Sequence, residues 1–164
     1  MRRVPRDVLV YLYRGPARAP KLLMLHRAPH RGDFWHWVSG APLAEESDRD
    51  AAIREMHEET GLDVTATIFL LGYRDEYPLR PQRRERWIEL YGPDVTHIPV
   101  ETFAAQAPVG WEPKLDEEHT ASAWCTFTEA ERRLSWPGDP RTLDHLRTTL
   151  VVLRRALGEV TWAG

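Results

Sequence analysis

Three glutamates in the stretch from Gly40 to Leu62 have the type and spacing that could bind a metal ion. Glu55, Glu58 and Glu59 fall within five consecutive positions. In a helix, which turns by about 100° per residue, they would gather on one side. Ile53 and Met56 would then lie on roughly the opposite side. Mg²⁺ and Mn²⁺ prefer carboxylate oxygens, so this face could bind a divalent ion, although a solvated charged face is the commoner case for an acidic helix taken alone.

Local signals predict the helix that would carry these glutamates. Ser47 is a good N-cap, with Asp50 three residues later as its partner. Gly61 suits the residue just past a helix end, so the spacing predicts a helix from Asp48 to Thr60. Like charges at these spacings repel, and carboxylates are unfavourable in a last helical turn. A bound cation would offset both effects.

The whole stretch resembles the Nudix box of the Nudix hydrolase superfamily. That pattern requires Gly, five residues, Glu, seven residues, and then Arg-Glu-apolar-any-Glu-Glu-any-Gly-apolar. Every fixed position is filled here, by Gly40, Glu46, Arg54, Glu55, Met56, Glu58, Glu59, Gly61 and Leu62. A match over this many positions is far more specific than a lone glycine motif.

The resemblance implies an Mg²⁺-dependent (or Mn²⁺-dependent) enzyme that splits a diphosphate bond by water attack. It implies that Glu55, Glu58 and Glu59 are metal ligands and that Glu58 and Glu59 take part in catalysis. Arg54 would orient the glutamates by ion pairing, and Glu46 would be an auxiliary acid. Gly40 and Gly61 would be required for backbone geometry.

Family members often take another carboxylate from outside the box, as a metal ligand or a general base. Glu118 is the choice here, at the start of a strand that leads to Trp124, and Glu117 is the second candidate. His119 is more typical of a hydrogen-bonded strand histidine than of a base.

Within the superfamily, the chain is most similar to the dihydroneopterin triphosphate pyrophosphohydrolase branch. Val38 and Ser39 replace the Pro-Gly that usually precedes the box, with Phe34 and Trp35 just upstream. Looser similarity lies in Leu23–Arg27, Tyr91–Thr96, Glu118–His119 with Trp124, and Ser135–Trp136. By analogy, the substrate would be a pterin triphosphate contacted by Arg27, Ser39 and Arg3.

Two further segments are candidates for substrate binding. Trp35 could stack on a bicyclic ring. The segment from Asp75 to Arg86 is predicted to be a loop, and its four arginines could contact phosphates, although a solvated loop is the commoner case.

Other substrates and one other class remain open. Pro78 suggests ADP-ribose members, Tyr77 suggests dinucleoside polyphosphate members, and the box is equally compatible with (d)NTP pyrophosphohydrolases. A Nudix-like ligand-binding regulator module is the non-enzymatic alternative. Such modules typically lose box carboxylates, which are intact here.

Composition limits the remaining possibilities. The 164 residues suit one domain spanning 1–164, and the net charge of −3 argues against nucleic acid as a partner. Cys125 is the sole cysteine, which favours a reducing, cytoplasmic setting. We expect neither a signal peptide nor a membrane span. A homodimer stays open, because the sequence does not specify an oligomeric state.

The elements around the box predict mixed α and β structure. β-branched and aromatic runs predict strands at 7–13, 21–26, 64–73, 87–91, 100–107 and 118–127, with an extended segment at 34–38. Thr128 and Glu131 predict a capped short helix, and leucines at helical spacing predict a C-terminal helix beginning at Pro140. The resemblance implies the α+β Nudix fold, an α/β/α sandwich whose mixed sheet lies between the catalytic and C-terminal helices.

Overall fold

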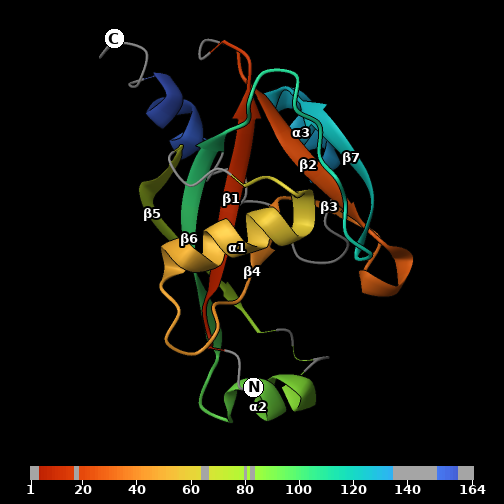
Figure 1. The fold of residues 1–164 in the computed structure, drawn as a ribbon. Coiled ribbons are helices and arrows are strands. Elements are labelled where there is room, and N and C mark those ends of the chain that lie inside the picture. The colour runs from red at the N-terminus through yellow and green to blue at the C-terminus, as the bar shows by residue number, and fades with distance from the viewer. Residues whose placement is uncertain are drawn as a thin grey trace.

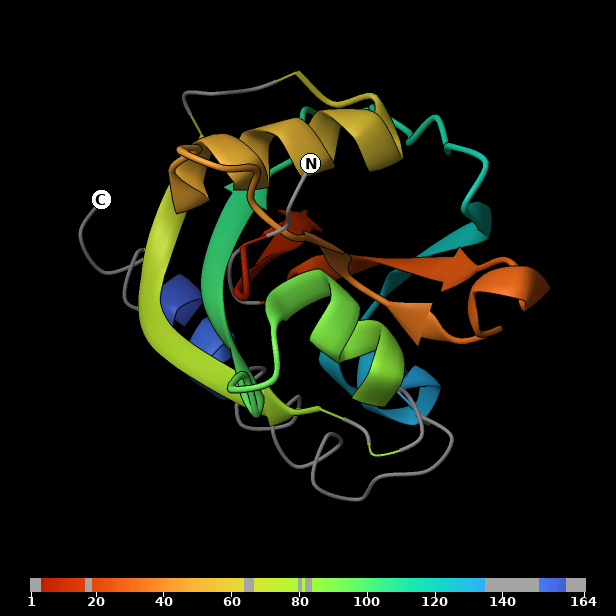
Figure 2. The same ribbon diagram turned by 90° about the horizontal axis from the view of Figure 1, so that it is seen from below.

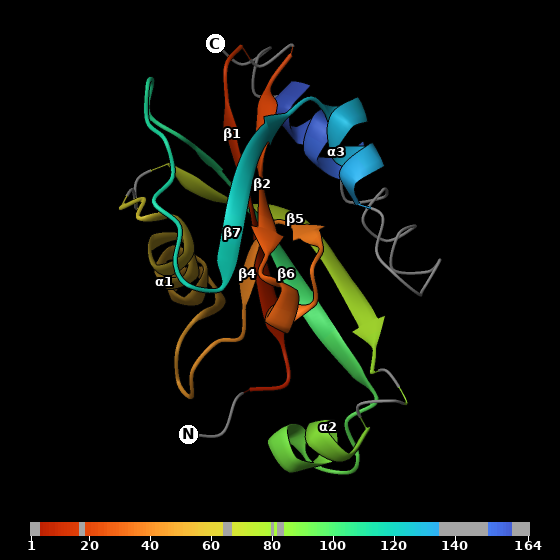
Figure 3. The same ribbon diagram turned by 90° about the vertical axis from the view of Figure 1, so that its right-hand side faces the viewer.

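A mixed β-sheet lies between two helical layers in the computed structural model of the protein, which describes residues 4–16, 19–63, 67–79, 81, 84–134 and 151–158. Helix α1 (Asp48–Thr60) covers one face. Helix α3 (Phe127–Arg133) and the helical residues 151–158 lie on the other face (Figures 2 and 3). The expected α+β sandwich is therefore confirmed.

Strand β1 lies at the centre of the sheet (Figure 1). It runs parallel to β6 and antiparallel to β4 and β2, while β6 pairs with β5, and β2 pairs with β3 and β7. The strands are β1 (Asp7–Arg14), β2 (Lys21–Arg27), β3 (Trp35–His36), β4 (Val38–Gly40), β5 (Ile68–Pro78), β6 (His97–Gln106) and β7 (His119–Cys125). A short 3₁₀ helix, η1 (Pro29–Arg31), follows β2.

Alternation along the central strand creates two cores. In β1, Val10 and Leu12 pack toward α1, whereas Tyr11 and Tyr13 pack toward α3 and residues 151–158. Met56 completes the first core and is fully buried. Because successive strand side chains point to opposite faces, one strand anchors both helical layers.

Helix α1 begins and ends where the sequence predicts. The Ser47 side chain accepts a hydrogen bond from the Asp50 backbone N–H at 3.0 Å. Gly61 adopts a left-handed conformation with φ of 75°, and its N–H donates to the His57 carbonyl. Helix α1 is thus fixed by local capping as well as by packing.

The prediction of a strand at 87–91 is wrong. Residues Arg84–Tyr91 form helix α2, and β5 continues to Pro78 through residues expected to be loop. Trp87 and Tyr91 stack at i and i+4, with ring centroids 5.3 Å apart. Aromatic residues favour strands only where a sheet can receive them, and α2 lies beyond the ends of β5 and β6, away from the sheet (Figure 1).

The cap of α3 is shifted by two residues from the predicted position. Thr126 and Glu129, rather than Thr128 and Glu131, form a capping box in which each side chain bonds the other residue's backbone N–H. In the predicted C-terminal helix, Leu153 and Leu157 are buried in the second core. Its predicted start at Pro140 lies outside the described residues.

None of the helices in the described parts of the chain combines the length and hydrophobicity needed to cross a bilayer.

Candidate active site

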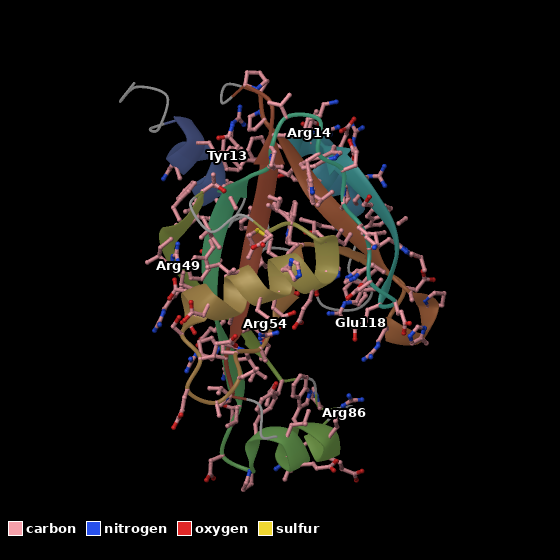
Figure 4. All side chains as sticks on the ribbon, in the orientation of Figure 1. Tyr13, Arg14, Arg49, Arg54, Arg86 and Glu118 are labelled. Carbon is pink, nitrogen blue, oxygen red and sulfur yellow. The ribbon has the colours of Figure 1, made fainter. Side chains whose placement is uncertain are left out.

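The site is built where β4 turns into the loop that leads to α1. In the view of Figure 4, Arg54 lies beneath the middle of α1, and Glu118 lies beyond the helix's C-terminal end. The guanidinium of Arg54 donates five hydrogen bonds, all to this loop and helix. Its acceptors are both carboxylate oxygens of Glu46 (2.9 and 3.0 Å), Glu55 Oε1 (2.8 Å), Glu58 Oε2 (3.1 Å) and the Ala41 carbonyl (3.1 Å).

Arg54 therefore holds three of the predicted acidic residues together. Its hydrogen bonds lower the pKa of Glu46, and the Glu46 and Glu55 carboxylates raise the pKa of Arg54. The planar fork of a guanidinium suits this arrangement, because it presents donors in several fixed directions. The orienting role expected of Arg54 fits this geometry.

Glu55 lies directly over the backbone of Gly40. A Cβ atom added at Gly40 would overlap the Glu55 carboxylate. The backbone of Gly40 does not adopt a positive φ. A glycine is needed here for the close approach of a side chain, and the unusual backbone freedom of glycine is not used.

Glu59, in the last turn of α1, is buried. It is 4% exposed, whereas Glu58 is exposed to solvent. The Ser39 backbone N–H donates to Glu59 Oε2 at 3.2 Å. Burial, together with the nearby Glu55 charge, raises the pKa of Glu59 well above its ordinary value. β4 lies close enough to cover the last turn of α1, and the helical pattern alone does not specify this burial.

These carboxylates suit a divalent cation in their chemistry. Glu59 is a buried acid with another carboxylate nearby, and a bound cation would relieve both unfavourable effects. Among the described residues, no three His, Cys, Asp or Glu side chains converge on a single point that could hold a metal. Glu55 and Glu58 instead share the same Arg54 nitrogen, so metal binding would require their carboxylates to turn toward Glu59.

Glu118, predicted to join the metal ligands, is engaged elsewhere. Its Oε1 atom lies 2.8 Å from a guanidinium nitrogen of Arg31 in η1, and its carbonyl accepts from the Ala28 N–H. Glu117 is exposed. A catalytic role for Glu118 would require it to leave Arg31.

Of the predicted substrate contacts, Arg27 and Ser39 lie at the site. Ser39 binds Glu59, and the Arg27 charge lowers the pKa of Glu59, which indicates that its guanidinium is near. Arg3 lies outside the described residues, as do Arg80, Arg83 and the Ser135–Trp136 segment. Arg84 and Arg86 are exposed on α2.

Trp35 does not suit the stacking role predicted for it. It packs with the core on the α3 side of the sheet, opposite α1, and the Arg133 guanidinium covers its ring at 4.6 Å from the centroid. Of the tryptophans in the described ranges, Trp111 and Trp124 pack against the core on the α1 side. Strand alternation places Trp35 and His36 on opposite faces, which the sequence could not resolve without knowing which face carries α1.

A buried histidine pair at the site was not predicted from sequence. His36 Nε2 lies 2.7 Å from His119 Nε2, and His119 Nδ1 lies 2.6 Å from Asp116 Oδ1. The expectation that His119 is a hydrogen-bonded strand histidine agrees with these contacts. No local signal indicates its partner, because His36 is 83 residues away in the chain.

Comparison with known proteins identifies the family of the chain. The NUDIX domain family model matches residues 3–146. An octanoyltransferase of Myxococcus xanthus is 32% identical over 133 residues, or 81% of this chain, but the chain spans only 34% of that protein's length. Dihydroneopterin triphosphate diphosphatase of Haemophilus influenzae is 29% identical over 128 residues, 76% of each chain.

A solved structure has a similar fold. The dihydroneopterin triphosphate pyrophosphohydrolase of Escherichia coli superimposes with a TM-score of 0.67 and 25% identity, covering 91% of this chain and 99% of that one. This chain has a mixed sheet between two helical layers, with clustered glutamates on one of the helices. The chain belongs to the Nudix family, and its named relatives support an enzyme of the pyrophosphohydrolase class.

Proposed function

We propose that this chain is a cytoplasmic, single-domain Nudix enzyme that hydrolyses a diphosphate bond in a nucleotide-like substrate with Mg²⁺ or Mn²⁺. The observation that carries the proposal is the Arg54 cluster, which keeps Glu46, Glu55 and Glu58 together beside the buried Glu59. Dihydroneopterin triphosphate is the first substrate to test, because two similar proteins carry that name. Nucleoside triphosphates, ADP-ribose and dinucleoside polyphosphates are the alternatives.

In this proposal Glu55, Glu58 and Glu59 would hold the metal. Glu118, which directly precedes β7, would join them after its carboxylate releases Arg31. A bound divalent ion would neutralise the bridging phosphates and acidify the attacking water. Ser39 orients Glu59 through its backbone N–H, and Arg54 orients Glu55 and Glu58. Arg27 supplies positive charge for a substrate phosphate.

Metal removal tests the proposal with a substrate panel. We expect the wild-type protein to hydrolyse the diphosphate bond of dihydroneopterin triphosphate, ADP-ribose, a diadenosine polyphosphate or a dNTP, with the phosphorus-containing products identified by ³¹P NMR. Activity should disappear with EDTA and return with Mg²⁺. Reaction in H₂¹⁸O will identify the phosphorus that is attacked, because the label stays on it. Failure to release product from any panel member would favour the ligand-binding regulator alternative.

Gly40→Ala should reduce activity without a comparable loss of stability. The added Cβ would meet the Glu55 carboxylate, the far end of a flexible side chain that can move aside at low cost to the fold. Displacing a metal ligand should lower metal affinity about 10- to 100-fold. The measurement is the Mg²⁺ concentration that gives half-maximal activity, alongside a thermal melt.

Gly158→Ala is the matched control, since an added Cβ there meets no atom within 4 Å among the described residues outside its own stretch of helix. It should retain wild-type activity. Equal Mg²⁺ requirements in wild type and Gly40→Ala would contradict the role assigned to Gly40.

A further inference from the structure

Two buried histidines meet above β2 on the side of the sheet that carries α1. His36 in β3 pairs with Leu25 of β2, and His119 in β7 pairs with Arg27 of the same strand. The two imidazole rings are nearly parallel, at an interplanar angle of 15°. Both residues are buried, with His36 7% and His119 5% exposed. Since β3 and β7 flank β2 without pairing with one another, the histidine contact is a side-chain link across β2.

The hydrogen-bonding partners limit which ring nitrogens of this pair can carry a hydrogen. The Asp116 carboxylate accepts from His119 Nδ1–H, so this nitrogen carries a hydrogen. Only one of the two facing Nε2 atoms can carry another, because two N–H groups at 2.7 Å would repel. Burial and the nearby Arg27 charge lower the pKa of His36, which keeps its ring neutral. At most one hydrogen therefore lies between the two rings, and His36 Nε2 also accepts a 3.4 Å contact from the Arg27 Nε–H.

The link continues to the candidate metal ligand. His36 Nδ1 lies 3.4 Å from Ser39 Oγ, and the Ser39 N–H donates to Glu59 Oε2 at 3.2 Å. Contacts thus run from Asp116 through His119, His36 and Ser39 to Glu59. They join the loop before β7 to β3, β4 and the last turn of α1.

The strand arrangement explains why Ser39 needs this support. β3 pairs with β2, whereas β4 pairs with β1, so the chain changes strand partners at Trp37. The backbone ladder of β4 therefore ties Ser39 to β1 and gives it no link to β2 or β7. The His36 side chain supplies that link.

We propose that His36 and His119 are positioning residues, which act through Ser39 to fix Glu59 at the metal-binding position. The inference rests on the proposed function, because it takes Glu59 to be a metal ligand. It assigns the pair no contact with substrate. Outer partners that orient metal ligands typically change metal affinity about 10- to 100-fold when they are removed.

A pair of substitutions at His36 separates positioning from simple packing. The amide of His36→Asn reaches about as far as Nδ1 and can retain the Ser39 contact. The amide of His36→Gln reaches about as far as Nε2 and retains the His119 contact while losing Ser39. Both variants remove the ring, so a packing role would affect them alike.

The readout is Mn²⁺ affinity, measured on the full chain by electron paramagnetic resonance of free Mn²⁺, with a thermal melt of each variant. We expect His36→Gln to bind Mn²⁺ about 10-fold more weakly than His36→Asn, at similar melting temperatures. The control is His26→Gln on β2, whose ring packs against Trp35 and should not affect Mn²⁺ affinity. Equal Mn²⁺ affinities in the two His36 variants, or affinities that only follow stability, would overturn the inference.

Measuring the wild-type protein first distinguishes the possible failures. If it binds Mn²⁺ but hydrolyses no panel substrate, the proposed reaction fails and the His36 comparison still decides the positioning inference. If it hydrolyses substrate and both His36 variants bind Mn²⁺ as it does, only the positioning inference fails. Absence of Mn²⁺ binding by the wild type would overturn both.

Discussion

Glu59→Gln is expected to give a folded protein with at least about 100-fold lower activity, which corresponds to ~3 kcal/mol of lost transition-state stabilisation. The amide oxygen of glutamine can accept the same hydrogen bond from the Ser39 N–H. The shape of the site is therefore retained. What is lost is the negative charge that would bind the metal.

The same substitution should stabilise the metal-free protein. Burial and Glu55 raise the pKa of Glu59 in the folded state, so the ionised form is disfavoured relative to the unfolded chain. Wild-type stability should therefore fall as the pH rises from the ordinary glutamate pKa to the raised one, and this loss persists at higher pH. Glutamine has no such dependence, and each 1 kcal/mol gained corresponds to roughly 2–4 °C in Tm at this chain length.

Thermal melts at pH 4 to 8, with EDTA and with Mg²⁺, will measure the effect. The Tm advantage of Glu59→Gln should grow with pH in EDTA and shrink when Mg²⁺ stabilises the wild type. Glu131→Gln on the exposed surface of α3 is the control and should match wild type throughout. A variant that retains wild-type turnover would refute the role of Glu59.

Arg54→Lys is expected to lower both stability and activity although it preserves the positive charge. Lysine offers three donors on one nitrogen and cannot reproduce the five bonds to Glu46, Glu55, Glu58 and Ala41. Carboxylates left without partners would repel one another. The Arg54 side chain is 24% exposed, so solvent screens part of the effect, and we expect a loss of about 2 kcal/mol.

This loss corresponds to a Tm decrease of roughly 4–8 °C. Activity should fall about 10- to 100-fold, since two proposed metal ligands lose their orientation. Arg74→Lys is the matched control. Arg74 also binds a carboxylate, that of Glu101, but its side chain is 70% exposed, and we expect wild-type melting and turnover. Similar behaviour of the two lysine variants would show that Arg54 is an ordinary surface residue.

The elements that the sequence predicted well are those with strong local signals. The bounds of α1 agree with the prediction at both ends, because Ser47 and Gly61 terminate the helix through their own side-chain and backbone chemistry. The strand predicted around Trp87 was wrong because the aromatic residues there are compatible with both strand and helix patterns. Their conformation depends on whether a sheet can receive them, and α2 lies beyond the ends of β5 and β6, away from the sheet (Figure 1).

The sequence by itself determined the family, the bounds of helix α1 and the group of acidic residues with Arg54, since these depend on spacing within a few helical turns. Only the tertiary structure decided that Glu59 is buried beneath β4 while Glu58 faces solvent. It also decided that Glu118 binds Arg31 and that His36 meets His119. These contacts join residues far apart in the chain, and the strand order, which local patterns do not encode, brings them together.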